Sequence, residues 1–435
     1  MGSSDHPAEA VAAHRMAAVD AQFYWMSAKV PNDQFLLYAF DGEPADLGKA
    51  IEQVCRRAAA CPDLRMRVED GCALTYPQWV PAAVGPEQAV RHDLGDQSWD
   101  DCLAAVAGLA AHQLDVRQMP WRLHAFAPVL GIPGVRGPGV VTVVQVAHAL
   151  ADGARASAMA AWLFGRAEPV PEVARLPVGF LPWRAIDAAR AHRGLVRDTR
   201  AGLLAPGVGS RPMLSTNAGT HGARSVRTLV RHRSQLPGPT VTIAVLAAVS
   251  EALSKALSKS PSNLFGAATD SLGAEVPMAK PVAPQAHNHF GNVVVGLYPQ
   301  LGRDVRVERI AIDLANARRR FEHVAAFSAD RAFASVPAAL LRWGVSQFDP
   351  DARPAQVAGN TVVSSVYRGA ADLSFGGAPV VLTAGYPALS PLMGLTHGVH
   401  GIGETVAISV HAAEAAFTDL DAGLDTYLQL LDAAL

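Results

Sequence analysis

Residues 139–147 (GVVTVVQVA) are the feature that most restricts the fold of this chain. The run is apolar, rich in β-branched residues and free of charge. Such a run is typical of a strand that is covered on both faces, because a strand with one exposed face would alternate with polar residues. Small helix-forming residues follow at 154–164 (ARASAMAAWLF). The two segments predict a buried strand leading into a helix, and therefore a layered α/β architecture.

Both halves of the chain are expected to mix strands and helices. Strands are predicted at 34–41, 122–129, 226–232, 292–299 and several places in 361–411, and further helices at 45–60, 98–114, 241–259, 305–326 and 416–435. Between the halves, residues 165–225 hold several prolines and a basic helical stretch at 186–204.

We therefore predict an α/β (α+β) protein of two domains, each a mixed sheet flanked by helices. The predicted boundaries are an N-terminal domain at 1–167, an interdomain crossover at 168–225 and a C-terminal domain at 226–435. The pattern leaves open an exchange of segments between the two domains.

Composition excludes several classes of protein. Of the 435 residues, 50% are hydrophobic and 17% are charged, with a formal net charge of −2. This composition excludes a disordered chain, which needs low hydrophobicity and high net charge. The 37 Lys+Arg are balanced by 39 Asp+Glu, so no global positive field favours nucleic acid. The low charged fraction leaves open apolar surface patches that contact lipid, membrane or a partner.

Neither a signal peptide nor a membrane span is expected. The N-terminus has no basic segment followed by an apolar one, and no stretch approaches the ~18 uninterrupted apolar residues of a membrane-spanning helix. We expect a cytoplasmic protein. The four cysteines, Cys55, Cys61, Cys72 and Cys102, form no CxxC pair, and we expect buried thiols rather than disulfides or metal ligands.

A histidine stands at the end of the predicted buried strand, in the order His148, three residues, Asp152, Gly153, helix. Histidine titrates near neutral pH and can take a proton from a hydroxyl, and the end of a strand would fix its position. Asp152 can hold the loop through a charged partner or by accepting hydrogen bonds from N–H groups at the helix start. Gly153 is expected to permit a turn that a Cβ atom would block. Because this spacing also occurs by chance, it does not establish catalysis on its own.

The sequence around this histidine resembles the bacterial wax ester synthase/diacylglycerol acyltransferase family. That family lies within the chloramphenicol-acetyltransferase-like, coenzyme-A-dependent acyltransferase superfamily. Its HHxxxDG signature appears here as Ala147-His148-(Ala-Leu-Ala)-Asp152-Gly153, and its upstream Pro-Leu-Trp element as Met119-Pro120-Trp121. Further similarities follow in order along the chain, among them CPDLRMRV at 61–68 and FGNVVVGLYPQL in the second half.

The resemblance implies a mechanism. His148 would be the general base that deprotonates an acceptor hydroxyl, which then attacks a fatty acyl-CoA thioester in a ternary complex without a covalent acyl-enzyme. Asp152 would orient the motif loop, together with Gly153, and the site would lie in a tunnel between the two domains. The acceptor would be an apolar alcohol, either diacylglycerol or a long-chain alcohol, and the product triacylglycerol or wax ester.

The resemblance also implies substrate-binding residues and partners. Pro120 and Trp121 would contact substrate, and Asn292 would be either a turn residue or a donor that lines the tunnel. Acyl-CoA is a co-substrate, and neither a bound cofactor nor a metal is implied. Peripheral contact with a membrane or lipid-droplet surface would suit such substrates.

Three departures from the family pattern leave alternatives open. The first histidine of the motif is replaced by Ala147, and the family's Asn-Asp pair on the helix after the crossover is replaced by Thr242-Ile243. Glu404 stands in the predicted final strands where the family often has Asn. One alternative is an enzyme of the condensation type that takes acyl chains from a carrier protein. The other is a degenerate, non-catalytic member that binds acyl-lipid.

Three weaker signals favour ordinary structure. His287-Asn288-His289 and His397…His400 have spacings that could hold a metal, but no carboxylate or thiolate cluster accompanies them, and we interpret both pairs as loop histidines. The basic stretch at 190–200 could lie on a membrane surface, although a solvated interdomain helix is the preferred interpretation.

Overall fold

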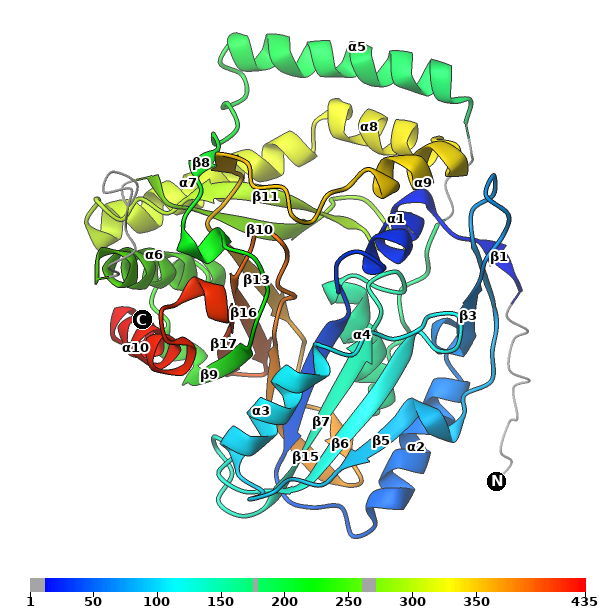
Figure 1. Cartoon of the computed structure of the whole chain (residues 1–435), viewed down its shortest axis with the longest axis vertical. Coiled ribbons are helices and arrows are strands. Elements are labelled where there is room, and N and C mark those ends of the chain that lie inside the picture. The colour runs from blue at the N-terminus through cyan, green and yellow to red at the C-terminus, as the bar shows by residue number, and fades with distance from the viewer. Residues whose placement is uncertain (1–11, 175–178, 260–270) are drawn as a thin grey trace.

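Two six-stranded mixed sheets, each flanked by helices, form the body of the molecule in the computed structural model (Figure 1). The structure describes residues 12–174, 179–259 and 271–435. This arrangement confirms the predicted α/β class with two sheet-containing domains. The domain boundaries at 167, 168 and 225 stay a prediction.

The first sheet has the strand order β14-β15-β2-β7-β6-β5. Its strands are β14 (Ser374–Phe375), β15 (Ala378–Gly385), β2 (Gln34–Phe40), β7 (Gly139–Val146), β6 (Trp121–Val129) and β5 (Ala89–His92). All eight residues of β7 are buried. Val140 and Val144 point into the core under helix α4, whereas Val141 and Val143 point into the core that contains α3. The prediction of a strand covered on both faces is therefore confirmed.

The second sheet has the order β11-β10-β13-β16-β17-β9. Its strands are β11 (Phe290–Gly296), β10 (Gly273–Ala279), β13 (Thr361–Tyr367), β16 (Leu395–Ile402), β17 (Thr405–Ala413) and β9 (Arg224–His232). Short strands form two smaller sheets: β1 (His14–Arg15), β4 (Gln78–Pro81) and β3 (Met66–Glu69) in one, β8 (Arg211–Pro212) and β12 (Gln356–Val357) in the other.

Ten α-helices lie in the described part of the chain. They are α1 (Ala18–Ser27), α2 (Leu47–Ala59), α3 (Trp99–Leu109), α4 (Gly153–Leu163), α5 (Leu181–Arg200), α6 (Val241–Lys259), α7 (Arg303–Phe321), α8 (Val324–Ala334), α9 (Ala338–Ser346) and α10 (Leu420–Ala434).

The second half of the chain contributes two strands to the first sheet. β14 and β15 come from the second half, yet β15 pairs with β2 and completes the first sheet. The chain then returns through β16 to the second sheet. One hydrophobic core cluster accordingly combines Leu37 and Val143 with Val226 and Ala407. The sheets are thus joined both by a shared core and by the backbone itself.

Capping side chains explain where some predicted helices change length. The helix predicted at 305–326 divides into α7 and α8, because the His323 side chain accepts a hydrogen bond from the Ala325 N–H and starts a new helix. The closing helix begins at Leu420 rather than 416, because Asp419 accepts from the Ala422 N–H. Local propensity did not reveal either cap.

Two expectations about composition can be compared with the structure. The cysteines are free, but only Cys61 and Cys102 are buried; Cys55 is half-buried and Cys72 is exposed, so the expectation of four buried thiols was wrong. Among the described residues, α6 is long and apolar enough to cross a membrane by length and composition. However, 61% of its segment Val241–Ser258 is buried inside the fold, as in a core helix.

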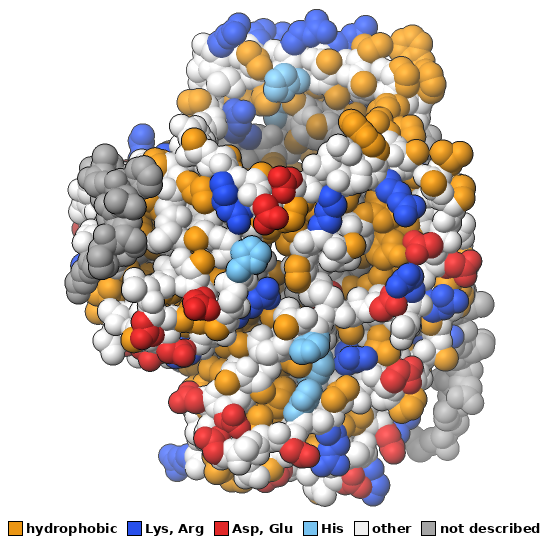
Figure 2. Space-filling model, in the orientation of Figure 1, with side chains coloured by type: hydrophobic (Ala, Val, Ile, Leu, Met, Phe, Trp, Pro, Cys, Tyr) orange, Lys and Arg blue, Asp and Glu red, His pale blue; other side chains and the backbone are white. Residues whose placement is uncertain are grey.

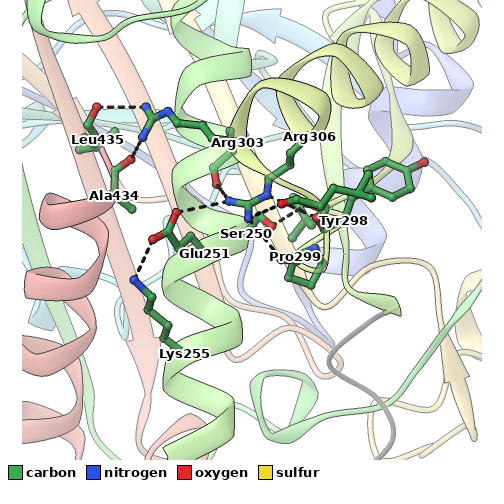
Figure 3. A network of polar contacts seen from close by, with 12 residues as sticks. Ser250, Glu251, Lys255, Tyr298, Pro299, Arg303, Arg306, Ala434 and Leu435 are labelled. Carbon is green, nitrogen blue, oxygen red and sulfur yellow. Dashed lines mark hydrogen bonds and ion pairs between the residues drawn. The ribbon is translucent and has the colours of Figure 1, made fainter.

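A buried arginine holds the helices of the second half together (Figure 3). Arg306 of α7 donates to the carbonyl oxygens of Ala247, Tyr298, Pro299 and Leu301, and pairs with Glu251 at 3.4 Å. Arg303, one turn earlier, donates to the carbonyls of Ala434 and Leu435 at the C-terminus. These bonds connect α6, α7 and α10, which cover the second sheet.

Replacing Arg306 by Met should lower the free energy of unfolding by about 3 kcal/mol, because four carbonyl oxygens lose this donor and Glu251 keeps only Lys255 as a cationic partner. Urea denaturation followed by circular dichroism measures the change. Arg318→Met, at an exposed position of the same helix, is the matched control and should change the stability by less than about 0.5 kcal/mol. Equal stability of the two variants would contradict the assigned role.

Candidate active site

His148 lies in the loop between β7 and α4, two residues after the end of the buried strand. Its ring stacks on Phe23 of α1, with centroids 4.0 Å apart and planes 5° from parallel. Phe290 of β11 approaches the ring from the second half of the chain at 5.7 Å. The side chain keeps partial exposure to solvent. The imidazole therefore packs against aromatic rings from both halves of the chain.

Asn288 fixes which nitrogen of His148 carries the proton. The Asn288 Nδ2 donates to Asp20 Oδ1 at 2.9 Å and to the His148 carbonyl oxygen at 2.7 Å. Both of these partners are acceptors, so the other amide atom, which lies 2.8 Å from His148 Nδ1, is the oxygen. Nδ1 must then donate, and the neutral ring presents Nε2 as its free lone pair. No described residue hydrogen-bonds to Nε2.

Burial lowers the pKa of His148, and the hydrogen bonds to its own backbone and to Asn288 oppose this shift. A lowered pKa keeps the imidazole neutral near pH 7. Neutral imidazole with a free Nε2 is the form that a general base requires.

Asp20 of α1 is a buried carboxylate behind Asn288. It accepts from the backbone N–H groups of His287 and Asn288 as well as from the Asn288 side chain. Burial is the main cause that raises the pKa of Asp20 to about 7, and the hydrogen bonds from Asn288 and His287 oppose it. Asp20 thus orients Asn288, and Asn288 orients His148.

Asp152 joins the motif loop to the second half of the chain. One carboxylate oxygen accepts from the Arg155 N–H at 2.9 Å and so caps α4. The other oxygen accepts from the His289 N–H at 2.8 Å, and the Asp152 N–H donates to the His287 carbonyl at 3.2 Å. The Asp152 side chain therefore holds the loop by accepting hydrogen bonds from backbone N–H groups, rather than through a charged partner.

Gly153 does not have the conformation expected from the sequence. Its φ angle is not positive, and it is the first residue of α4. A Cβ atom built there would meet Val366 at 3.6 Å and Gln34 at 3.8 Å, which are ordinary van der Waals distances. The expectation that a Cβ would block the turn was wrong.

Arg155 anchors α4 from its first turn. Its guanidinium is buried, pairs with Asp63 at 2.6 Å and donates to the Pro171 carbonyl at 2.7 Å. The pair joins the motif helix to the segment at 61–68 that the family resemblance had singled out.

The predicted substrate-binding residues make no hydrogen bond or ring contact with the His148 side chain, whose contacts are Asn288, Phe23 and Phe290. Trp121 is 0% exposed, belongs to the core and donates from Nε1 to the Leu64 carbonyl at 2.9 Å. The Pro120 carbonyl accepts from the Ala147 N–H at 2.9 Å, which positions the start of the motif loop. These placements support a structural role for both residues, since a substrate would have to displace the core to reach Trp121.

Asn292 is an exposed residue in β11 rather than a turn residue. It pairs across the strand with Pro277, and its amide lies 3.3 Å from Glu275. The asparagine that contacts the catalytic candidate is Asn288, four residues earlier.

The departures from the family pattern have packing roles. Ala147 is buried in the core beneath the loop. Thr242 donates to Ser365 at 2.8 Å, and Ile243 is buried in the second core. Thr242 therefore still offers a hydroxyl at this position, directed to the strand β13.

A large cavity of about 1070 Å³ lies next to the site. Its wall combines residues of both halves, with Asp20, His287 and Asn288 among its polar groups and Trp79, Trp162 and Phe333 among its apolar groups. His148 itself is absent from this wall. Asn288 and Asp20 thus separate the cavity from the imidazole.

The two histidine pairs have different positions. His287 and His289 contribute backbone groups to the Asp152 contact, in a segment between β10 and β11. His397 and His400 are buried in β16, so their assignment to a loop was wrong. His397 bonds Thr361 at 2.9 Å and Tyr427 at 2.7 Å. Within the described ranges, no group of three His, Cys, Asp or Glu side chains could hold a metal ion.

The sequence did not indicate four residues of the site: Asp20, Phe23, Asn288 and Phe290. The one available signal was an aspartate in the otherwise apolar segment AAVDAQFYW, where a buried acid needs partners. The pairing of that aspartate with Asn288 depends on packing across 268 residues of chain.

Comparison with known proteins identifies the second half of the chain. Residues 286–433, about a third of the chain, match the family model described as the WS/DGAT C-terminal domain. The predicted resemblance to the wax ester synthase/diacylglycerol acyltransferase family is confirmed. No curated protein sequence matches the chain.

Solved structures show that the WS/DGAT-like fold extends over the whole chain. The wax ester synthase/diacylglycerol acyltransferase from Marinobacter aquaeolei VT8 has a TM-score of 0.61 at 17% identity, with 97% of this chain and 98% of that chain covered. The trichothecene 15-O-acetyltransferase from Fusarium sporotrichioides has a TM-score of 0.61 at 13% identity, with 97% and 94% covered. A starter condensation domain of rhizomide synthetase, in complex with C8-CoA, has a TM-score of 0.57 at 15% identity, with 97% and 95% covered.

The raised pKa of Asp20 predicts a specific dependence of stability on pH. A folded pKa of about 7 lies above the ordinary value of 3.8, so the folded state holds the proton more tightly and loses stability as the pH rises between these values. The free energy of unfolding of the parent, relative to that of Asp20→Asn, should fall by up to about 3 kcal/mol between pH 5 and pH 8. Urea denaturation of both proteins at the two pH values measures this difference. A difference that stays constant with pH would contradict the assignment.

Proposed function

We propose that the protein transfers a fatty acyl group from acyl-CoA to the hydroxyl of an apolar alcohol, with His148 as the general base. The observation that carries the proposal is the orientation of His148: Asn288 occupies Nδ1 and leaves Nε2 free at the junction of the two halves. The WS/DGAT C-terminal domain and the shared fold support the acyltransferase class.

In the proposed reaction, Nε2 takes the proton of the alcohol while the alcohol oxygen attacks the thioester carbonyl carbon. The resulting tetrahedral intermediate collapses, the carbon–sulfur bond breaks, and the CoA thiolate recovers the proton from the imidazolium. The products are an oxygen ester, either triacylglycerol or wax ester, and free CoA. Phe23 and Phe290, which pack against the imidazole, would limit the access of water that hydrolyses the thioester.

We place the apolar part of a substrate in the large cavity beside Asn288. Its volume of about 1070 Å³ falls at the upper end of known ligand pockets, and its wall carries Met16, Trp79 and Phe333. Because His148 does not line the cavity, the reacting atoms would have to pass the Asn288 side chain.

The predicted cytoplasmic location stays a prediction.

A release assay for free CoA tests the proposal. Purified protein with a long-chain acyl-CoA and either diacylglycerol or a long-chain alcohol should release CoA, and His148→Ala should lower kcat/KM by at least ~100-fold. His221→Ala, at an exposed position, is the matched control and should retain parental activity. Turnover that persists in His148→Ala would exclude this mechanism. Bound lipid with no turnover in the parent protein would favour a non-catalytic lipid-binding protein. Ala147 and Thr242-Ile243, which depart from the family pattern, are the reason to consider this alternative.

A condensation-type enzyme is the second candidate. The similarity to the rhizomide synthetase domain is close to that of the Marinobacter enzyme, and the fold alone does not separate them. The same assay with acyl groups loaded on a carrier protein distinguishes the donors. Turnover with the carrier but not with acyl-CoA would overturn the first proposal and favour the second.

We propose that Asn288 positions His148. The pH profile of kcat/KM can distinguish this role from a purely structural role of Asn288. The Asn288 hydrogen bond raises the pKa of His148, against the effect of burial. Asn288→Ala should therefore move the acidic limb of kcat/KM to a lower pH than in the parent, and lower the plateau about 10-fold or more. Asn292→Ala, an exposed asparagine, is the control and should leave both unchanged. An unshifted profile in Asn288→Ala would contradict this role.

A further inference from the structure

Helix α5 is unusual because none of its 20 residues is buried. It lies at the outer edge of the molecule, beside α8, at the top of Figure 1. Polar contacts hold it at both ends: the Gly179 N–H donates to Ser335 at 3.3 Å, and Arg320 donates to Thr199 at 3.3 Å. A helix held in this way presents most of its surface to whatever lies outside the protein.

The N-terminal part of α5 presents large apolar side chains. Phe180, the residue before the helix, and Trp183 are each 66% exposed, and Ile186 follows Trp183 after three residues, so Trp183 and Ile186 share one side of the helix. Helix α9 and the segment after it add Leu340, Trp343 and Phe348, of which Trp343 is 61% exposed. Hydrophobic side chains gather at this end of α5 and over α9 in Figure 2. We call these six residues the α5–α9 face.

The remainder of α5 is cationic. The helix carries five arginines and two aspartates, and four of the arginines, Arg190, Arg193, Arg197 and Arg200, follow the apolar residues and are exposed. Lys and Arg side chains line the outer edge of the helix in Figure 2. The surface therefore joins an aromatic end to a cationic row on one side of the protein.

The α5–α9 face also lies beside the cavity. Phe333 and Ala334 line the cavity, and the next residue, Ser335, binds Gly179 at the start of the aromatic end. An apolar molecule that leaves a lipid surface at this face would be near the cavity wall. If the cavity holds the apolar substrate of the proposed reaction, a lipid contact at this face would bring that substrate to the cavity wall.

We propose that the α5–α9 face docks on an anionic lipid surface. Exposed Trp and Phe side chains favour the boundary between headgroups and acyl chains, where an aromatic ring is partly buried. The arginine row is attracted to anionic headgroups, each cation contributing about 1 kcal/mol near the surface. Apolar insertion combined with cationic attraction is the physical pattern of a peripheral membrane helix. Charge complementarity therefore selects an anionic lipid surface as the occupant.

Vesicle flotation tests the proposal with the full-length chain. The protein should float with vesicles of phosphatidylcholine containing phosphatidylglycerol, and binding to pure phosphatidylcholine should be at least about 10-fold weaker. Trp183→Ser combined with Trp343→Ser should lower binding to the anionic vesicles at least about 10-fold. Tryptophan emission of the parent should shift to shorter wavelength on binding, and this shift should be lost in the double variant.

Three controls separate docking from folding and from catalysis. Val305→Ser, an exposed apolar residue on α7, should bind as the parent does. Replacing Arg190, Arg193 and Arg197 by Glu should abolish the preference for anionic lipid, and circular dichroism should show every variant folded. His148→Ala should bind vesicles normally, so the docking proposal and the proposed reaction can fail independently. Flotation with neither vesicle type, or unchanged flotation of the double tryptophan variant, would overturn the proposal.

Discussion

The contact between the motif loop and residues 287–289 is the interaction on which the rest of the site depends. Asp152 accepts the N–H of its own helix with one oxygen and the N–H of His289 with the other, so a single carboxylate fixes the loop and joins the two halves. Asn288 adds a bond to the carbonyl of His148. These contacts bury polar groups that would be costly without partners, so the loop has one favoured position. The position of His148 therefore depends on the docking of the two sheets.

The same contact explains the electrostatic character of the site. Asp20 is buried and His148 is half-buried, and burial shifts the pKa of each group in the direction that favours its neutral form. Asn288 lies between them and hydrogen-bonds to both, with a donor on one side and an acceptor on the other. An amide in this position transmits orientation without adding a charge. It is consistent with chemistry that begins from a neutral imidazole.

The structure shows where the many apolar residues of this weakly charged chain lie. Much of the apolar excess fills three cores in the described part of the chain, and two of these cores combine residues from both halves. Another part remains outside, at the aromatic end of α5 and on α9. The charges are also unevenly placed, because the arginines of α5 lie in a row on one side although the whole chain has a net charge of −2. A nearly neutral protein can therefore present a locally cationic surface.

Local patterns in the sequence were sufficient for the strand β7, the helix α4 and the order His148, Asp152, Gly153, because hydrophobic periodicity and helix capping depend on neighbouring residues. The mixture of strand and helix patterns in both halves, with a proline-rich segment between them, extended this to two sheet-containing domains. Tertiary structure alone decided that Asn288 rather than Asn292 faces the imidazole, that Trp121 is core, and that β15 crosses into the first sheet. Those features join residues more than a hundred positions apart or select one side of an element. Such choices follow from how two sheets pack, and no neighbouring residue in the sequence records them.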